Sequence, residues 1–345
     1  MKIGDKEIGQ RTYVIAEFGV NHNGSLERAK EAIVKAAEAG ADAIKFQTYT
    51  ADELVVKGTP KFWEAESKVD EGLDQYEAYK ALEGFKYEWY PELMKCCEEN
   101  NIEFLSTPFS IEAADYLNAI GMKAFKVASS DMSTLPYLKH IARFQKPIIL
   151  STGASTVEEI IESIQTILNE GNPDIILLHC MLKYPTPDEH ANLSAIPLLK
   201  MMGLPVGISD HTLGVFPALI AVAEGACVVE KHYTTDKTLD KSADHWLSVD
   251  PTELKEIVDG ARKIEELRGK PRTDWYDVEN ETRTYDKRSL VSKMTILKGM
   301  TITEDMLTFK RPGTGIWPNK LHEVIGKTAA KDIDVDTILT TDLLI

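Results

Sequence analysis

The sequence lacks the long apolar runs that a membrane protein needs. No stretch of its 345 residues approaches the roughly 18 consecutive apolar residues of a membrane-spanning helix. The N-terminal segment MKIGDKEIGQ also lacks the basic and apolar regions of a secretion signal. We therefore expect a cytoplasmic protein with no membrane partner.

The chain also has fewer basic than acidic residues. Lysine and arginine number 39 against 55 aspartates and glutamates, which leaves a formal net charge of −16. A chain of this charge has no non-specific attraction to nucleic acid or to anionic lipid. We expect no nucleic-acid partner, and an anionic substrate would need a local basic pocket.

Cysteine is rare, and nucleotide-binding motifs are missing. The four cysteines, Cys96, Cys97, Cys180 and Cys227, have no spacing typical of a zinc knuckle or a redox CxxC pair. We expect them to be reduced and structural, because free cysteine usually behaves as a small apolar side chain. Neither GxGxxG nor a Walker P-loop occurs, so the sequence indicates no nucleotide cofactor.

What the sequence does contain is a regular alternation of short apolar runs with helical patterns. Residues 25–40, for example, repeat apolar side chains at helical spacing behind Ser25, the expected N-cap. Such alternation is typical of βα units around a parallel sheet. Eight units in about 265 residues favour a closed (β/α)₈ TIM barrel over an open doubly wound sheet. The predicted strands are residues 12–19, 42–49, 102–109, 124–131, 147–154, 174–181, 205–212 and 227–234.

The chain changes character after the eighth unit. We assign residues 1–268 to the barrel, with a long insertion at 50–100, and residues 269–284, which are charged and aperiodic, to a linker. Residues 285–345 are too few for more than a small β-rich domain. Its strand-like segments are residues 288–296, 306–312 and 337–344.

Polar side chains stand where the predicted barrel strands end. Turn residues such as Gly, Asn and Asp would be the ordinary choice there. In a barrel the carboxyl ends of the strands converge on one mouth, so these side chains predict an active site. They are Glu17, Lys45, Gln47, Ser106, Thr107, Lys126, Ser129, Ser151, Thr152, His179, Ser209, Asp210, His211, Glu230, Lys231 and His232.

Two of these residues are lysines inside apolar strands, Lys45 in AIKFQ and Lys126 in FKVAS. A strand lysine is usually a solvated edge residue, but a closed barrel has no edge. A lysine that faces the lumen must find an anion. Together with Thr107, Ser129 and Ser151, the two lysines predict a cradle for phosphate or carboxylate.

Two histidines, His211 and His232, end neighbouring strands. A single histidine at a strand end is often a hydrogen-bonded structural residue, but two on adjacent strands can converge on a metal. Nearby carboxylates can add ligands or orient the rings, and the role of Asp210 stays open. The geometry admits Mn²⁺, Zn²⁺ or Fe²⁺.

Glu17 follows YVIA and precedes the loop GVNHNG. Its carboxylate either acts as a general acid or base at the mouth or caps the next helix. We expect His22, in the same loop, to be exposed and without a role.

Eight segments, in this order and at this spacing, resemble the sialic acid synthases. They are IAEFGVNHNGS, IKFQTYT, FLSTPFS, FKVASSD, PIILSTGAS, LHCMLKYPTP, VGISDHTLG and VVEKHYT. The segment RSLVSKMTILKGMTITEDMLTFKRPGTGI resembles the small antifreeze-like (SAF) domain that follows the barrel in this family. The resemblance covers nearly the whole chain and implies a nonulosonate (N-acetylneuraminate) synthase that condenses phosphoenolpyruvate on a TIM barrel.

The resemblance also implies a reaction. Phosphoenolpyruvate would condense with the open-chain aldehyde of an N-acetylmannosamine-type sugar, an N-acylated amino sugar. The products would be phosphate and a nine-carbon 2-keto acid, either N-acetylneuraminate or N,N'-diacetyllegionaminate. Glu17 would be catalytic, and His211 and His232 would hold a divalent metal, usually Mn²⁺, with Mg²⁺ or Co²⁺ as alternatives.

The remaining implied roles concern the two substrates. The residues that would hold phosphoenolpyruvate are Lys45, Thr107, Lys126, Ser129, Ser151 and Ser209. Tyr184 and Asp244 match sugar-side positions. Arg311 would reach into the neighbouring subunit's active site, which implies a domain-swapped homodimer.

Met181 and Leu182 depart from the family pattern, which usually has small polar residues here. Polar groups at these positions would meet sugar hydroxyls. The two apolar side chains, with Trp246 nearby, indicate a less hydroxylated sugar such as a 6-deoxy, 4-acylamino hexose; the alternative is that one of them packs behind the strand.

Other functions stay open. A pseudaminic acid synthase, or another phosphoenolpyruvate-dependent keto-sugar-acid synthase using a phosphosugar, belongs to the same class of enzyme. A carbohydrate-binding protein with an inactive barrel belongs to another class, and it would lack lysines or histidines at the strand ends. This chain has both residue types there.

Overall fold

The computed structural model describes residues 1–63, 72–83, 86–239, 244–269 and 272–345. The chain divides into two compact units, residues 1–269 and 270–345, and each unit has its own apolar core. Residue 270 and residue 271, which fall in the expected linker, lie outside the described residues. Within the described ranges, no helix has both the length and the apolar character needed to cross a bilayer.

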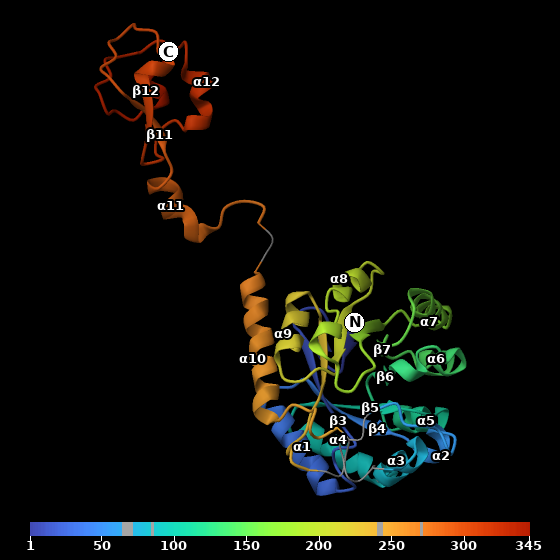
Figure 1. The fold of residues 1–345 in the computed structure, drawn as a ribbon. Helices are drawn as coiled ribbons and strands as arrows, with labels where there is room; N and C mark the ends of the chain where they lie inside the picture. The colour runs from blue at the N-terminus through green and yellow to red at the C-terminus, as the bar shows by residue number, and fades with distance from the viewer. Residues whose placement is uncertain (64–71, 84–85, 240–243, 270–271) are drawn as a thin grey trace. The chain divides into compact units, whose positions relative to one another are not determined.

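The first unit is built on an eight-stranded parallel sheet in the order β5-β4-β3-β10-β9-β8-β7-β6. Strands β5 and β6, at the two ends of this order, lie against each other and bring the sheet round into a nearly closed barrel (Figure 1). This confirms the predicted TIM barrel and its eight strands. They are β3 (Tyr13–Gly19), β4 (Ala43–Thr48), β5 (Glu103–Pro108), β6 (Phe125–Val127), β7 (Ile148–Ser151), β8 (Ile175–Cys180), β9 (Val206–Asp210) and β10 (Val228–His232).

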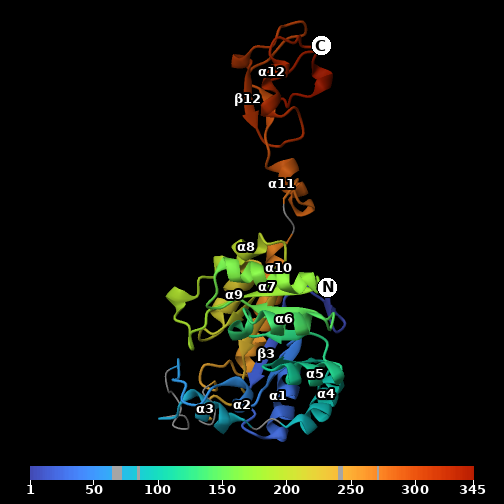
Figure 2. The ribbon, with the colours of Figure 1, turned by 90° about the vertical axis from the view of Figure 1, so that its right-hand side faces the viewer.

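A helix follows each of the eight strands, and together these helices surround the sheet (Figures 1 and 2). The first begins as predicted, because the Ser25 hydroxyl accepts the backbone N–H of Arg28 at 3.3 Å. The helices are α1 (Leu26–Glu38), α4 (Tyr90–Glu99), α5 (Ile111–Ala119), α6 (Leu135–Ala142), α7 (Val157–Asn169), α8 (Ala195–Lys200), α9 (Phe216–Ala223) and α10 (Pro251–Arg268).

Alternation along the strands separates two apolar layers. Side chains that point outward pack against the helices, whereas those that point inward form a smaller cluster that includes Tyr13, Leu105 and Ile149. A short N-terminal hairpin, β1 (Lys2–Ile3) and β2 (Lys6–Glu7), adds Ile3 to this inner cluster. The hairpin was not predicted, because two-residue strands carry no periodic signal. The inner apolar cluster occupies the amino ends of the strands and leaves the carboxyl ends to polar residues.

The insertion between β4 and β5 contains α2 (Ala51–Leu54), α3 (Gln75–Leu82) and a 3₁₀ turn at Tyr87–Trp89 ahead of α4. The Asp74 carboxylate begins α3 by accepting the backbone N–H of Glu77 at 2.8 Å. The insertion therefore has helical structure of its own beside the barrel mouth.

The second unit contains the antiparallel pair β11 (Ser289–Ser292) and β12 (Leu307–Lys310), with α11 (Asn280–Tyr285) before it and α12 (Leu321–Val324) after it. The predicted third strand, residues 337–344, is wrong. That segment makes only isolated bridges, such as Val291 to Ile338, and then turns into a 3₁₀ helix at Thr341–Leu343. The segment pairs with β11 only briefly, where Ser292 N–H donates to the Thr337 carbonyl at 2.9 Å and Leu339 N–H donates to the Leu290 carbonyl at 2.8 Å.

Helix α10 follows the loop that carries Asp244, and Asp250 caps it. The Asp250 carboxylate accepts the backbone N–H groups of Thr252 and Glu253 at 2.8 and 2.9 Å. Replacing Asp250 with Ala should lower the free energy of unfolding by about 1 kcal/mol. The midpoint of urea unfolding measures this loss. Thr134→Ala is the matched control, because Thr134 begins α6 without a side-chain cap bond; equal losses in both variants would contradict the capping argument.

Candidate active site

A cavity of about 680 Å³ opens at the carboxyl ends of the barrel strands. Every one of the eight strands contributes to its wall. The contributing residues are Glu17, Lys45, Gln47, Thr107, Lys126, Ser151, Cys180, Ser209, Glu230 and His232. Closure of the barrel therefore brings together side chains that are more than 200 residues apart in the chain.

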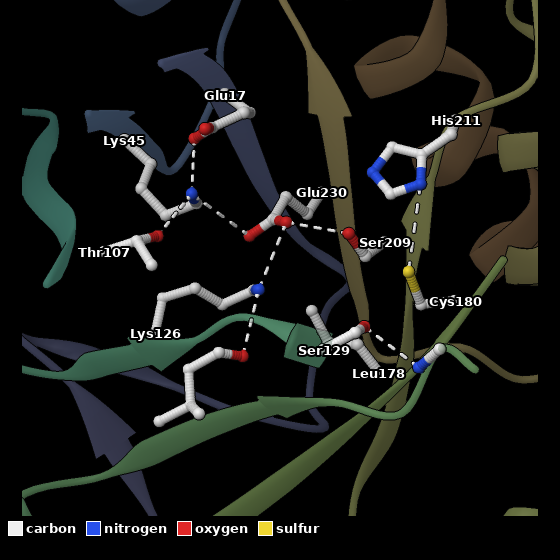
Figure 3. Close-up of polar contacts among 12 residues, drawn as sticks. Glu17, Lys45, Thr107, Lys126, Ser129, Leu178, Cys180, Ser209, His211 and Glu230 are labelled. Atoms are coloured by element: carbon white, nitrogen blue, oxygen red, sulfur yellow. Dashed lines mark hydrogen bonds and ion pairs between the residues drawn. The ribbon is translucent and has the colours of Figure 1, made fainter. Parts of the chain in front are cut away.

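A network of buried charges lies at the bottom of this cavity (Figure 3). The Lys45 ammonium lies 2.5 Å from Glu17 Oε2, donates to the Thr107 hydroxyl at 2.8 Å and lies 3.8 Å from Glu230 Oε2. The Lys126 ammonium lies 3.6 Å from Glu230 Oε1. Two lysines and two carboxylates thus neutralise one another inside the barrel.

The ionisation of these groups follows from burial and from their neighbours. Burial raises the pKa of Glu17, and the charge of Glu230 adds to that effect, although Lys45 and Gln47 oppose it. Burial alone would also raise the pKa of Glu230, but Lys126, Lys45 and the Ser209 hydroxyl outweigh it and lower the value to about 2. Glu230 is therefore a fixed anion, whereas Glu17 is the carboxyl group best able to exchange a proton.

Hydroxyl groups complete the predicted anion cradle. The Ser209 hydroxyl donates to Glu230 Oε1 at 2.8 Å, and the Ser129 oxygen accepts the backbone N–H of Gly153 at 2.9 Å. The Ser151 hydroxyl is buried and has no hydrogen-bond partner among the described residues. A buried hydroxyl without a partner is costly, so the Ser151 hydroxyl has hydrogen-bonding capacity to spare in this cavity.

The two histidines face the same cavity, and their ring centroids lie 5.5 Å apart. Nδ1 of His211 lies 2.8 Å from the carbonyl oxygen of Met181. Because a carbonyl can only accept, Nδ1 carries a hydrogen, so Nε2 is the nitrogen through which the neutral ring could bind a cation. Burial lowers the pKa of His232 to about 4 despite the nearby Asp244, so its ring is neutral at pH 7. Both rings can therefore serve as cation ligands.

The described residues supply no third ligand at this point. None of the described His, Cys, Asp and Glu residues form a group of three or more with a geometry that could hold a metal ion. The Asp244 carboxylate lies 3.8 Å from Nδ1 of His232, and the Cys180 sulfur lies 3.8 Å from Nδ1 of His211. A cation between the histidines would take its other ligands from water or from a substrate.

Some of the predicted sugar-side residues line the cavity, and others do not. Leu182, Tyr184 and Asp244 line the cavity, and the Tyr184 ring lies 4.1 Å from the His211 ring, centroid to centroid. Met181 is half-buried outside the cavity wall and contributes its carbonyl group. Arg311 belongs to the second unit, where it pairs with Asp286 at 2.7 Å.

Some residues of the wall were not predicted. Glu230 was predicted only as one of the carboxylates that could add a ligand or orient a ring, and its pairing with the lysines was missed. Its place two residues before His232 puts both side chains on the inward face. Aromatic residues of the insertion, Phe62, Trp63 and Tyr79, also line the cavity. No periodic pattern identifies them, because their position depends on how the insertion folds over the barrel mouth.

Two expectations about single residues need revision. His22, expected to be exposed, is buried, and its Nδ1 accepts the backbone N–H of Gly24 at 3.0 Å. Cys180 is a free cysteine, as are Cys96, Cys97 and Cys227, but its sulfur faces the cavity beside His211. Cys180 is therefore part of the site wall and not only of the core.

Comparison with known proteins identifies the family of this chain. The model of the NeuB family matches residues 32–273, which is more than half of the chain. The chain belongs to the NeuB family. A SAF domain model matches residues 287–345 of this NeuB-family chain.

Relatives of this NeuB-family chain align over nearly its full length. The N,N'-diacetyllegionaminic acid synthase of Legionella pneumophila is 39% identical over 332 residues, covering 95% of this chain and 93% of that protein. The pseudaminic acid synthase of Campylobacter jejuni strain 81-176 is 36% identical over 335 residues, covering 97% of each. The crystal structure of the N-acetylneuraminic acid synthetase of Leptospira borgpetersenii, in complex with citrate, is 34% identical with a TM-score of 0.73, covering 82% of this chain and 94% of that one.

These relatives agree at a coarse level. All three are named as synthases or synthetases of a sugar acid, which is N,N'-diacetyllegionaminic, pseudaminic or N-acetylneuraminic acid. The NeuB-family chain is therefore an enzyme, and its activity is of the phosphoenolpyruvate-condensing transferase type.

The loop that carries Asp244 is held by a buried histidine. His245 Nδ1 lies 2.7 Å from the Thr234 hydroxyl, and Nε2 lies 3.2 Å from the Asn23 side-chain oxygen. Burial, with help from Arg28, lowers the pKa of His245 to about 4. This histidine links the loops that follow β3 and β10.

The lowered pKa of His245 predicts how the free energy of unfolding depends on pH. An unfolded histidine takes up a proton near pH 6.5, whereas the folded one does so only near pH 4. The stability that comes from keeping His245 neutral should thus be fully present above pH 6.5, and it should be lost as the pH drops toward 4. Between pH 7 and pH 4.5, the free energy of unfolding should fall by about 2 kcal/mol less in His245→Asn than in the wild type. Urea unfolding at the two pH values measures this difference.

The control removes a histidine from the surface. His140 lies at the surface beside Asp115, so His140→Asn should keep the wild-type difference between the two pH values. If the His245 and His140 variants behaved alike, burial of His245 would not be the cause of the loss.

Proposed function

We propose that this enzyme condenses phosphoenolpyruvate with the open-chain aldehyde of an N-acylated mannosamine-type sugar. Water is consumed, and the products are a nine-carbon 2-keto sugar acid and phosphate. The observation that carries this proposal is the buried network of Glu17, Lys45, Glu230 and Lys126 beside the paired His211 and His232. The family and the named relatives support the same reaction.

Phosphoenolpyruvate is assigned to the lysine side of the cavity. Its carboxylate and phosphate would take Lys45 and Lys126 as charged partners, with hydroxyl donors from Thr107, Ser129, Ser151 and Ser209. Lys45 already donates to Thr107, and the Ser151 hydroxyl is without a partner among the described residues. The cradle thus has both fixed charge and spare hydrogen-bonding capacity.

The charge of the cavity wall supports a divalent cation as cofactor. The described charged side chains of the wall are two lysines and four carboxylates, Glu17, Asp131, Glu230 and Asp244. An anionic substrate enters such a cavity more readily when a cation balances that excess. We assign the cation to His211 and His232, with Mn²⁺ as the first choice and Mg²⁺ or Co²⁺ as alternatives. When bound, it would act as a Lewis acid on the aldehyde oxygen.

The proposed chemistry needs one proton transfer that Glu17 can serve. C3 of phosphoenolpyruvate forms the new bond to the aldehyde carbon, and the aldehyde oxygen takes up a proton to become a hydroxyl group. Water adds at C2 and gives up one proton; cleavage of the C2–O bond then releases phosphate, which carries away the second proton as C2 becomes a ketone. Glu17 has a raised pKa, lies 2.5 Å from the Lys45 ammonium and stands in register with Lys45 on one side and His232 on the other. Its carboxylate can therefore accept the proton of the attacking water. Lys45 and Lys126 hold the anionic groups throughout.

For the sugar we propose a 2,4-diacetamido-trideoxy hexose, which leads to N,N'-diacetyllegionaminate. Leu182, Trp246 and the aromatic side chains of the insertion give the wall an apolar surface that suits a methyl group and an acyl group. The Legionella relative supports this choice. N-acetylmannosamine, which leads to N-acetylneuraminate, is the second candidate, and the pseudaminic branch is the third because of the Campylobacter relative.

We further propose that Arg311 acts in the active site of a neighbouring subunit, in a domain-swapped homodimer located in the cytoplasm. Its side chain is more than half exposed, and the guanidinium keeps donors beyond its contacts with Asp286. An arginine suits the acyl oxygen of the sugar, because it presents several N–H donors in one plane.

The proposed reaction can be tested with purified protein, phosphoenolpyruvate and Mn²⁺. Phosphate should be released with N-acetylmannosamine or with the 2,4-diacetamido-trideoxy sugars, and most rapidly with the latter. A chelator should abolish the release, and Glu17→Gln should slow it by roughly 10²- to 10⁴-fold. Absence of release with every sugar, or full activity in the chelator, would contradict the proposal.

The basis of sugar choice can be tested separately at residues 181 and 182. Leu182→Asn should shift kcat/KM toward the more hydroxylated sugar by about 10-fold or more, because Leu182 lines the cavity. Met181→Thr is the matched control, since its side chain lies outside the wall, and it should leave the preference unchanged. Equal behaviour of the two variants would reject the role given to Leu182.

A further inference from the structure

The two histidines are held in place in different ways. His232 is the last residue of β10 and stands in register with Glu17 of β3. The ladder continues past it, because Tyr233 N–H donates to the Glu17 carbonyl at 2.7 Å. The backbone of His232 is therefore fixed by sheet hydrogen bonds.

His211, in contrast, lies just beyond the end of β9. The last registered pair of β9 and β10 joins Asp210 to Lys231. Beyond this pair, the His211 carbonyl accepts the N–H of Thr186 at 2.8 Å, and Nδ1 lies 2.8 Å from the Met181 carbonyl. Ladder bonds to β10 thus stop one residue before the histidine that has to face His232.

Beyond that point, side chains on the outer face of the barrel connect the two strands. The Lys231 ammonium lies 2.8 Å from Asp210 Oδ2 and donates to the Thr212 carbonyl at 2.6 Å. Asp210 Oδ1 accepts the Thr212 N–H at 2.9 Å and its hydroxyl at 2.7 Å. The residues before and after His211 are therefore both tied to one lysine of β10.

This group is fully enclosed by protein. Asp210 and Lys231 are 2% and 1% exposed, and Thr212 is 3% exposed. Because side chains alternate along a strand, Asp210 and Lys231 point away from the cavity while their neighbours His211 and His232 point into it. Neither residue can contact a substrate or a cation in the cavity, so any effect they have on it is indirect.

We propose that Lys231 and Asp210 are positioning residues that fix the spacing between His211 and His232 and thereby set the affinity of the site for a divalent cation. The inference rests on the proposed function, because it takes the two histidines as cation ligands. It assigns a purpose to a buried ion pair that touches no ligand, and such pairs are costly to bury unless their geometry serves another need. Lys231 fixes the backbone around His211, as the sheet hydrogen bonds fix the backbone of His232.

Mn²⁺ affinity provides a test that does not depend on turnover. Titration of the protein with Mn²⁺, followed by the electron paramagnetic resonance signal of the free ion, gives the Kd without any substrate. Lys231→Met and Asp210→Asn should each raise the Kd by about 10- to 100-fold, the usual effect of groups that orient metal ligands.

The pair of variants separates positioning from simple electrostatics. Removing the positive charge of Lys231 would by itself favour a cation, whereas removing the negative charge of Asp210 would disfavour it. Weaker binding in both variants supports positioning. Tighter binding in Lys231→Met, or an unchanged Kd with only a lowered melting temperature, would overturn it.

Two further variants keep the test informative. Thr212→Val removes a hydroxyl contact to Asp210 without changing charge or threatening the fold, and it should weaken Mn²⁺ binding by a smaller factor. Thr48→Val is the matched control, because Thr48 makes buried hydroxyl contacts with Ser106 and Tyr90 on the outer face, away from the histidines; its Kd should equal that of the wild type.

The wild-type titration distinguishes failure of the proposed cation site from failure of the positioning role. Wild-type protein that binds no Mn²⁺ would overturn the cation site itself and this inference with it. Wild-type binding together with unchanged Kd values in the Lys231, Asp210 and Thr212 variants would overturn the positioning role and leave the cation site intact.

Discussion

Neutralisation of two buried lysines inside a closed barrel is the constraint on which this active site depends. Lys45 and Lys126 are almost completely enclosed, and an isolated ammonium group in such a place would lose its proton or unfold the site. Glu17 and Glu230 prevent this from two other strands. The four side chains can meet only if the sheet closes on itself, so the chemistry and the barrel require each other.

Because these charges already balance one another, the protein itself holds both lysines in position. The anionic substrate that we propose would exchange partners with Glu17 and Glu230, so the protein would reorganise little on binding. The two carboxylates also differ, because Glu230 interacts with both lysines and with Ser209, whereas Glu17 is paired chiefly with Lys45. Similar residues thus take different roles through their surroundings.

The outer face of the barrel carries a matching arrangement. Asp210 and Lys231 neutralise each other on the outside of the same two strands whose inward residues are His211 and His232. The alternation of a β-strand makes this possible, since consecutive residues serve opposite faces. One short motif in each strand therefore supplies both a cavity side chain and the support behind it.

The sequence by itself determined the barrel, its eight strands and most of the residues at its mouth. Apolar alternation is a local property, and a polar side chain at the end of a buried run can be recognised without any knowledge of its partners. The N-terminal hairpin was missed, because two-residue strands carry no period, and residues 337–344 were wrongly predicted as a strand, because an apolar run alone does not show how far it pairs.

Only the tertiary structure decided which side chains act together. Glu230 became the partner of both lysines, Leu182 turned toward the cavity while Met181 did not, and Asp210 faced Lys231 instead of the histidines. Each outcome depends on strand register and on which face a residue occupies. Those are relations between segments far apart in the chain, and barrel closure sets them where local pattern cannot.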